Sequence, residues 1–377
     1  MGMKSRRWPL IGLVTVVAAL FIAGTDAWAF HHFSANAATK SYPDDYLNAV
    51  ACPSPARCWA VGQTASAPGG NTLSETRDPL LKQETAGHWR TVALATPGDA
   101  LEAIACPGAA DCWAVGGNGA GGQAVIEHWA GHTWQLAPSP VVSGSQLDAV
   151  SCASAGACGA TGGTQAHSGS PGDLVEYWNG VRWATVTTVA GGLRPQELSC
   201  PGAGYCLALG VRGGAAAAAA YSGGRWTAVP PPAAPASPAA PTPPAAPAGR
   251  AAGVVPSLFG CASPVMCLAA FPGASLVTDV WNGRTWAPVT SSMLTYPIGL
   301  TCSGGRACWL LGMTRKDRPL ALRWQRDGWA PVTVPTRPHR GYLSALACAS
   351  GCWAVGGQGG SRRNGVPYTN PLIEPLA

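Results

Sequence analysis

Short apolar segments alternate with turn-forming residues along most of the chain. One stretch shows the unit well: residues 147–152 (LDAVSC) end in a cysteine, Cys158 follows, and residues 174–178 (LVEYW) and 183–186 (WATV) flank the dipeptide 179–180 (NG). Asn-Gly between two such segments is the strongest short signal for a β-hairpin, because both residues tolerate positive φ. The stretch therefore predicts four short strands joined by tight turns.

The same unit recurs seven times. Its first cysteine stands at positions 52, 106, 152, 200, 261, 302 and 348, with steps of 54, 46, 48, 61, 41 and 46 residues. A period in the forties is typical of propeller blades. In the recurring segment Cys-Trp-Ala-Val-Gly both faces of the strand are apolar or small, so the sheet must be covered on both sides, as it is between radially packed blades. Residues 47–377 thus predict an all-β fold: a seven-bladed β-propeller of four-stranded antiparallel blades.

The repeat positions account for most of the conspicuous side chains. Fourteen of the 16 tryptophans occupy such positions, so we expect them to form the core between blades rather than an aromatic ligand cage. The third unit differs, with Gly159 where the first, second, sixth and seventh units carry Trp. Glu127, Glu176 and Glu374 recur at one position of the third strand. Recurrence once per blade indicates structural hydrogen bonding rather than a catalytic pair.

The 14 cysteines form seven close pairs, with none left over. Such pairing predicts one local disulfide per blade and an oxidising compartment. Buried free thiols are the alternative. A zinc site is disfavoured, since two pairs would have to meet, whereas the pairs recur once per repeat. The predicted bridges are Cys52–Cys58, Cys106–Cys112, Cys152–Cys158, Cys200–Cys206, Cys261–Cys267, Cys302–Cys308 and Cys348–Cys352.

The N-terminus predicts export. A basic start precedes an apolar run at 8–24, and the segment 27–29 (AWA) offers a cleavage site. We expect residues 1–29 to be a cleaved signal peptide, with an uncleaved membrane anchor as the alternative; only in that case would the protein contact a membrane. The protein would then be extracytoplasmic, either secreted or anchored.

Two further segments lie outside the repeat pattern. The seventh unit stops after its third strand, so we expect a leader at 30–46 to supply the ring-closing strand. A Pro/Ala-rich insert at 229–250, between the fourth and fifth units, predicts an extended tether; a solvated loop without function is the alternative.

A disulfide-bearing, Trp-rich repeat that closes with W-N-G-x-x-W, as at 178–183, resembles secreted bacterial β-propeller proteins and, in degenerate form, the sialidase Asp-box and kelch-type propellers. The resemblance covers residues 47–377. The Asp-box motif is S-x-D-x-G-x-T-W. Residues 283–286 supply the G-x-T-W half, but Trp281 stands where the Asp should be, and no unit restores it. The hydrolase activity of some Asp-box propellers is therefore not implied.

The sequence contains no strong catalytic or metal-binding motif. The G-x-G-x-x-G at 117–122 lies between two strands instead of opening a helix, which indicates a loop. His128 and His132 have a ligand-like spacing but no third ligand nearby. We predict no catalytic residue, metal or cofactor. A carbohydrate-active enzyme, such as a sialidase-like hydrolase or a lyase, stays an alternative that a carboxylate cluster at the mouth of a central channel would favour.

Positive charge is concentrated near the C-terminus. Residues 301–377 hold ten Lys or Arg against three Asp or Glu, although the whole chain carries only +6. Most of these cations fall in loops of variable length, where binding sites are common. The predicted ligand-binding residues in blades 6 and 7 are Arg315, Lys316, Arg318, Arg337, His339, Arg340, Tyr342, Arg362, Arg363 and Tyr368.

These patterns predict an exported, non-catalytic binding or scaffolding propeller. Its expected partner is an anionic cell-envelope polymer, glycan or protein, and ordinary solvated loops are the alternative for the basic residues. A structural envelope protein is a further alternative. We expect a monomer and no nucleic-acid partner, since the basic residues are not interleaved with aromatic residues along a groove.

Overall fold

The computed structural model describes the greater part of the chain from residue 44 onward. The described residues are 44–54, 57–66, 76–94, 100–117, 122–140, 144–164, 172–186, 189, 192–202, 204–233, 256, 258–271, 275–303, 307–316, 318–326, 328–332, 341–348, 352–361 and 367–376. All of them belong to one compact unit, Ala37–Ala377. Within these residues no helix is long and apolar enough to cross a bilayer. The predicted signal peptide or anchor lies outside the described residues.

The described residues form β-strands and connecting turns. The first sixteen strands are β1 (Asp44–Ser54), β2 (Arg57–Ser66), β3 (Thr76–Thr85), β4 (His88–Val92), β5 (Ala100–Gly108), β6 (Asp111–Gly117), β7 (Ala124–Trp129), β8 (Trp134–Leu136), β9 (Ser145–Ser154), β10 (Ala157–Thr164), β11 (Gly172–Trp178), β12 (Trp183–Thr185), β13 (Arg194–Gly202), β14 (Tyr205–Arg212), β15 (Ala215–Ser222) and β16 (Arg225–Val229). The others are β17 (Leu258–Ser263), β18 (Met266–Phe271), β19 (Leu276–Trp281), β20 (Trp286–Ser291), β21 (Tyr296–Ser303), β22 (Ala307–Met313), β23 (Pro319–Gln325), β24 (Gly328–Val332), β25 (Gly341–Cys348), β26 (Cys352–Ser361) and β27 (Pro367–Leu376).

Successive strands pair antiparallel in groups of four. Four separate sheets have the orders β1-β2-β3-β4, β13-β14-β15-β16, β17-β18-β19-β20 and β21-β22-β23-β24. The groups β5–β8 and β9–β12 are counted as one eight-stranded sheet because a single residue pair, Gly117 with Gln146, joins them. The last sheet contains β25, β26 and β27. The predicted all-β fold of four-stranded antiparallel sheets is confirmed for the described residues.

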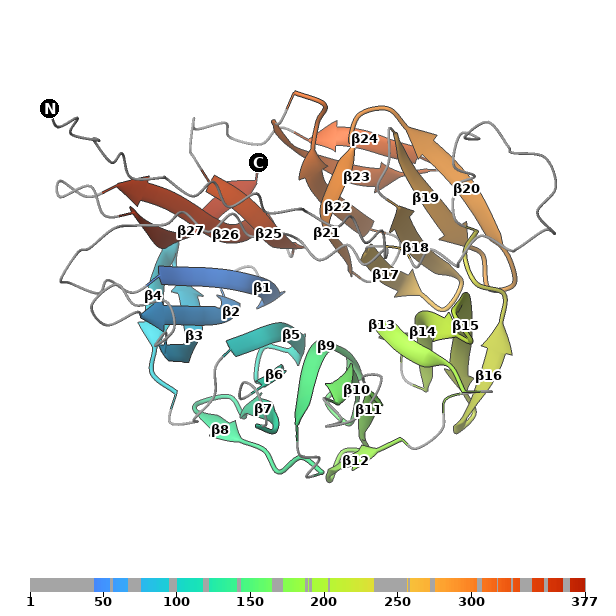
Figure 1. The fold of residues 1–377 in the computed structure, drawn as a ribbon, viewed down its shortest axis with the longest axis horizontal. Helices are drawn as coiled ribbons and strands as arrows, with labels where there is room; N and C mark the ends of the chain where they lie inside the picture. Colours follow the sequence, from blue (N-terminus) through green and yellow to red (C-terminus); the bar gives the residue numbers. More distant parts are fainter. Residues whose placement is uncertain are drawn as a thin grey trace, which may run out of the picture. The chain divides into compact units, whose positions relative to one another are not determined.

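The first strand of each group lies innermost. β1 contacts β5, and the contacts continue through β9, β13, β17, β21 and β25, which contacts β1 again (Figure 1). β1 begins at Asp44, ahead of the expected start at Leu47. The part of the predicted leader before Asp44 lies outside the described residues. The first strands therefore meet in a closed cycle.

Seven disulfides staple the hairpins, as the cysteine spacing predicts. Each bridge joins the first and second strands of one group, with Cα atoms 3.9–4.1 Å apart. In several hairpins the two cysteines stand directly opposite each other, for example Cys152 with Cys158 and Cys261 with Cys267. None of the described cysteines is free. The local pairing is confirmed in every case.

Tryptophans of neighbouring groups pack against one another. The ring of Trp59 in β2 lies 4.7 Å from that of Trp129 in β7 and 5.1 Å from that of Trp134 in β8. Trp59 is fully buried. The same contact recurs between Trp113 in β6 and the next group, and the sequence prediction that these rings form a core between sheets is confirmed for these groups.

The Pro/Ala-rich insert begins at the last residue of β16, and its first residues lie against the next sheet. Val229 still pairs with Ala218, so the insert begins within a strand rather than beyond it. The Trp286 indole N–H then donates to the Pro230 carbonyl at 2.9 Å, and the Ala233 N–H donates to Asp279 Oδ2 at 2.7 Å. Residues 234–250 of the insert lie outside the described residues.

Candidate functional site

A β-bulge recurs in the innermost strands. Leu47 pairs with Gly62 and Ala49 pairs with Val61, so Asn48 is left without a partner in the register. The opposite glycine is required, because a Cβ on Gly62 would lie 1.9 Å from the Tyr46 carbonyl oxygen. The bulged residues are Asn48, Glu102, Asp148, Gln196, Ile298 and Ser344.

Polar residues at these bulges connect neighbouring inner strands. The Ser344 hydroxyl of β25 donates to the Leu47 carbonyl of β1. The Asn48 side-chain amide of β1 donates to the Leu101 carbonyl at 3.1 Å and to Glu102 Oε2 at 3.0 Å, both in β5. These bonds stabilise the cycle of inner strands where their backbones do not pair.

Three carboxyl groups follow one another across β5, β9 and β13. Burial raises the pKa of Glu102, and the nearby charge of Asp148 raises it further. Burial also raises the pKa of Asp148, although Gln146 donates a hydrogen bond to it at 2.8 Å. Burial and the Asp148 charge raise the pKa of Glu197 to about 8. We call Glu102, Asp148 and Glu197 the acidic row.

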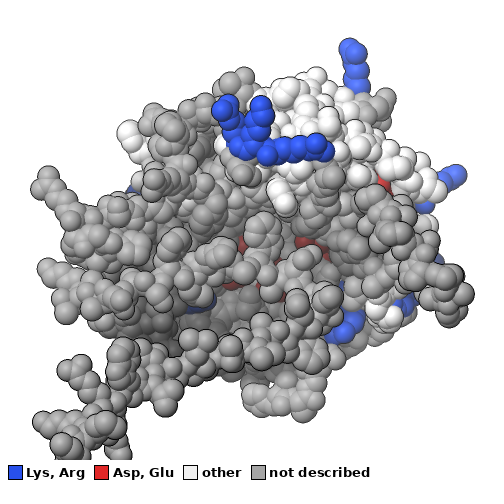
Figure 2. Space-filling view, turned by 45° about the horizontal axis from the view of Figure 1, so that its top comes forward, with Lys and Arg blue, Asp and Glu red and all other residues white. Residues whose placement is uncertain are grey.

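The acidic row is only partly withdrawn from water. Asp148 is exposed and the other two are half-buried. Figure 2 shows Asp and Glu atoms recessed near the middle of the face and Lys and Arg side chains grouped at its upper margin. Sequence reasoning missed the row, since its members are about fifty residues apart. One feature of the sequence could have indicated the row: a carboxylate directly follows the first apolar residue of two units, as in Leu101-Glu102 and Leu147-Asp148.

The basic turn between β22 and β23 displays three of the predicted binding residues. Arg315, Lys316 and Arg318 are all exposed. Thr314 holds the turn: its N–H donates to the Arg318 carbonyl at 2.9 Å, and its hydroxyl accepts the N–H groups of Lys316 and Arg318 at 3.4 and 3.2 Å. The turn therefore presents cations from a hydrogen-bonded backbone.

The backbone positions of Tyr342 and Tyr368 lie at one end of the β25–β27 sheet. This end corresponds to the end of the β21–β24 sheet that carries the basic turn. Tyr342 is the second residue of β25 and pairs with Gly357; Tyr368 is the second residue of β27 and pairs with Gly360. In an antiparallel group the start of the first strand, the start of the third strand and the turn between the second and third lie at one end. The other predicted binding residues, Arg337, His339, Arg340, Arg362 and Arg363, lie outside the described residues.

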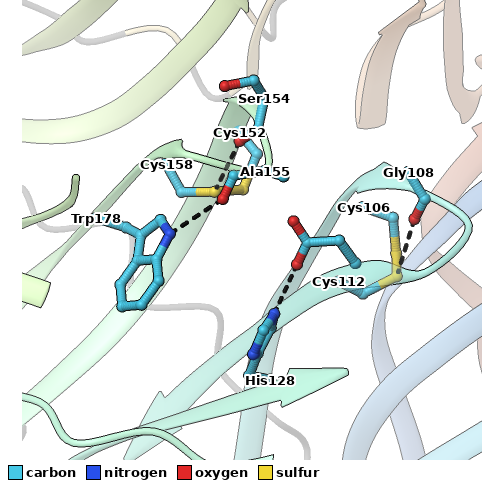
Figure 3. Close-up of polar contacts among 10 residues, drawn as sticks. Cys106, Gly108, Cys112, His128, Cys152, Ser154, Ala155, Cys158 and Trp178 are labelled. Atoms are coloured by element: carbon cyan, nitrogen blue, oxygen red, sulfur yellow. Dashed lines mark hydrogen bonds and ion pairs between the residues drawn. A yellow bond between two sulfur atoms is a disulfide. The ribbon is translucent and has the colours of Figure 1, made fainter. Parts of the chain in front are cut away.

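His128 is held by contacts within its own sheet. Its Nε2 lies 2.7 Å from Asp111 Oδ1, a contact drawn as the dashed line at His128 in Figure 3. Its ring also stacks on Trp113, with centroids 3.9 Å apart. In the part of the chain that the structure describes, no three His, Cys, Asp or Glu residues are grouped closely enough to hold a metal ion. The histidine spacing seen in the sequence thus belongs to a packed hairpin.

The recurring carboxylates of the third strands are buried acceptors. Glu176 is fully buried and accepts a hydrogen bond from the Ser139 hydroxyl at 2.9 Å, and Asp279 stands at the equivalent position and accepts the Ala233 N–H. Burial raises the pKa of Glu127 and of Glu176 to about 7. For Glu176 the predicted structural role is confirmed. The side chain of Glu374 lies outside the described residues.

Comparison with known proteins supports the fold. No family model and no curated protein matches the chain. Among solved structures, YCF48 bound to D1 peptide has 13% identity and a TM-score of 0.54, covering 89% of this chain and 94% of that one. The RRP9 WD40 repeats have 11% identity and a TM-score of 0.54, covering 91% and 99%. The chain is a β-propeller. At such identities the likeness shows the fold alone, and the hydrogen-bonded groups described above are the blades of this propeller.

Proposed function

We propose that this β-propeller is an exported, non-catalytic binding or scaffolding protein that engages an anionic envelope polymer, glycan or protein through loops of its sixth and seventh blades. The observation that carries the proposal is the basic turn, whose backbone is fixed by Thr314 and whose three cations are exposed. Cations carried on an ordered backbone bind an anionic chain at less entropic cost than cations on a mobile loop do. Propellers of this kind include WD40 repeats and one solved with a bound peptide, and a binding role is compatible with both.

We count seven blades in this proposal. Among the described residues, seven innermost strands contact one another in a cycle and each carries one end of a local disulfide. Within the same residues, only the pair Gly117 and Gln146 joins the second group to the third. Export is supported by the seven bridges, because disulfides persist in oxidising compartments. Residues 1–29 are the proposed signal peptide or anchor, and residues 30–46 the proposed leader.

The charge distribution favours the margin of the face for an anionic partner. The acidic row lies across the inner strands of blades 2, 3 and 4, whereas the basic turn belongs to blade 6. An anionic chain would be repelled at the centre by those members of the row that are ionised, and attracted at the margin. This separation supports the loops of blades 6 and 7, rather than the central hollow, as the proposed binding region.

Reversal of the charge on the basic turn should weaken binding to an anionic resin. We expect the double variant Arg315→Glu/Arg318→Glu to elute from heparin at lower salt than the unmodified protein, because surface ion pairing is screened and charge-dependent. The matched control is Arg182→Glu/Arg284→Glu, which makes the same charge change on exposed hairpin turns at the opposite end of the blades. The variant Arg362→Glu/Arg363→Glu extends the test to blade 7. Equal shifts for the basic-turn variant and the control would show that only net charge matters and would overturn the proposal.

The acidic row supports a second candidate, a carbohydrate-active enzyme. Glycoside hydrolysis needs one protonated and one ionised carboxyl group flanking the scissile bond. Glu197, with its pKa raised to about 8, suits the acid, and Asp148 suits the base or nucleophile. If this function holds, the unmodified protein releases reducing ends from bacterial envelope polysaccharide, and Glu197→Gln and Asp148→Asn each abolish the release. No release above a blank by the intact protein would exclude the candidate.

A further inference from the structure

The third blade lacks the tryptophan with which blades 1 and 2 each fill the space toward the next blade. In blade 2, Trp113 faces His128 across the β6–β7 pair, and its ring lies 4.6 Å from Trp178 and 5.2 Å from Trp183 of the next blade. Blade 1 uses Trp59 in the same way. In blade 3 the equivalent residue is Gly159, so no indole extends from this position toward blade 4.

A cavity of about 390 Å³ opens at this place. Gly159 pairs with Tyr177 in its own blade, as Trp113 pairs with His128. Across the interface stand Tyr221 and Trp226, the equivalents of Trp178 and Trp183, and all four residues line the cavity. The volume falls within the range of small-molecule sites, roughly 300–1,000 Å³. The cavity therefore occupies the site that an indole fills in blade 2.

Aromatic rings form the walls of the cavity. The Tyr177 ring lies 5.8 Å from Tyr221, and the Tyr221 ring lies 5.4 Å from Trp226. These are the separations at which aromatic rings attract one another in tilted arrangements. Leu198 also lines the cavity and lies against Gly159, since a Cβ added to Gly159 would meet the Leu198 Cδ2 at 2.6 Å. A planar ring fits such walls better than a flexible chain does.

One cation stands at the cavity mouth. Arg225 begins β16, is exposed and lines the cavity together with the neighbouring Gly224. The carboxylate of Glu176, which also lines the cavity, is fully buried and accepts hydrogen bonds from Ser139 at 2.9 and 3.1 Å. An anionic group on a bound ring would therefore meet a positive charge at the opening.

We propose that this cavity binds an aromatic carboxylate of indole size, with the ring between Tyr177, Tyr221 and Trp226 and the carboxylate at Arg225. The ring replaces the absent indole of position 159. The ligand is either a free aromatic acid or the C-terminal residue of a peptide, since both present the same chemistry. The site lies at the end of blades 3 and 4 where hairpin turns join β11 to β12 and β15 to β16. It is independent of the basic turn in blade 6.

Titration of the full-length protein with indole-3-propionate, followed by calorimetry and saturation-transfer NMR, tests the site. We expect saturable binding of one equivalent, and weaker binding of uncharged indole. An acetylated peptide that ends in Trp, compared with its C-terminal amide, separates the two sources: peptide-acid binding much tighter than that of indole-3-propionate would identify a chain terminus, and equal or weaker binding a free acid. Absence of saturable binding by all these ligands at millimolar concentration would overturn the proposal.

Two variants test whether the ligand binds in this cavity. Gly159→Trp should abolish binding by restoring the indole, with the Leu198 side chain moving aside. Arg225→Ala alters an exposed residue, so the fold is retained; it should weaken the carboxylate ligand about two- to fivefold and leave neutral indole unchanged. Folded Gly159→Trp that still binds would refute the assignment. If Gly159→Trp does not fold, Arg225→Ala decides, and equal affinities for the carboxylate in Arg225→Ala and the unmodified protein refute it.

Discussion

Reduction of all seven disulfides is expected to unfold the protein at 25 °C. Six bridges join cysteines six residues apart and one joins cysteines four apart. In the loop-entropy account each such bridge contributes roughly 2 kcal/mol by restricting the unfolded chain. The loops do not overlap, so together they contribute on the order of 15 kcal/mol, as much as the whole stability of an ordinary domain.

The core of this propeller offers little to replace that contribution. The third strand of blade 4, β15, buries only methyl groups along 217–220, where blade 2 buries Val125, Ile126 and Trp129. Because stabilisation follows the apolar area buried, such a strand contributes little.

Tryptophan fluorescence and circular dichroism, recorded with and without a phosphine reductant, measure the effect. A reduced protein that keeps its native spectrum and a cooperative melt would contradict the expectation. The variant Cys200→Ser/Cys206→Ser removes one bridge and should lower the free energy of unfolding by only about 2 kcal/mol.

Stability should fall as the pH rises from about 4.5 to 7. Glu127 and Glu176 are almost completely buried, and their pKa values rise from 4.5 to about 7 in the folded protein. Between these values the unfolded chain has lost a proton that the native state retains, so the unfolded state binds fewer protons and is favoured as pH increases. Each shift corresponds to roughly 3 kcal/mol, and the loss is complete above pH 7.

Thermal denaturation at pH 5 and pH 8 measures this loss. The double variant Glu127→Gln/Glu176→Gln should lose less melting temperature between the two pH values than the unmodified protein does. The loss that remains comes from Glu197, whose pKa is raised to about 8, and the amide introduced at position 176 keeps an oxygen that can accept the Ser139 hydrogen bond. Asp78→Asn, at an exposed position of β3, is the matched control and should leave the pH dependence intact. If the unmodified protein is equally stable at both pH values, these carboxyl groups are not buried as described.

The sequence was sufficient for the strands and the disulfides because both are local. A hairpin brings Cys152 to Cys158 across a few residues, and Asn179-Gly180 marks its own turn. The bulges were not predicted. In the sequence, Asn48 and Glu102 look like ordinary strand residues. Only the strand register shows that each is a bulge beside a glycine of the second strand, and only the fold brings β1 beside β5.

The basic turn and the cavity at Gly159 were likewise only partly predictable from the sequence. The charge count drew attention to Arg315, Lys316 and Arg318, and the structure adds the Thr314 hydrogen bonds that fix their turn. Gly159 was visible as a departure from the repeat. Its meaning depended on which rings face it from the neighbouring blade, and those rings are far away in the chain.

Every bridge in this protein pairs a cysteine with the next cysteine along the chain. As a chain emerges in order, each second thiol appears when its correct partner is the nearest unpaired one. Oxidation in step with emergence therefore needs no reshuffling of wrong bridges, and each hairpin can be sealed before the following blade exists. The cost is that no disulfide links one blade to another. The contact of the last blade with the first, between β25 and β1, therefore rests on packing and on hydrogen bonds such as that from Ser344 to the Leu47 carbonyl.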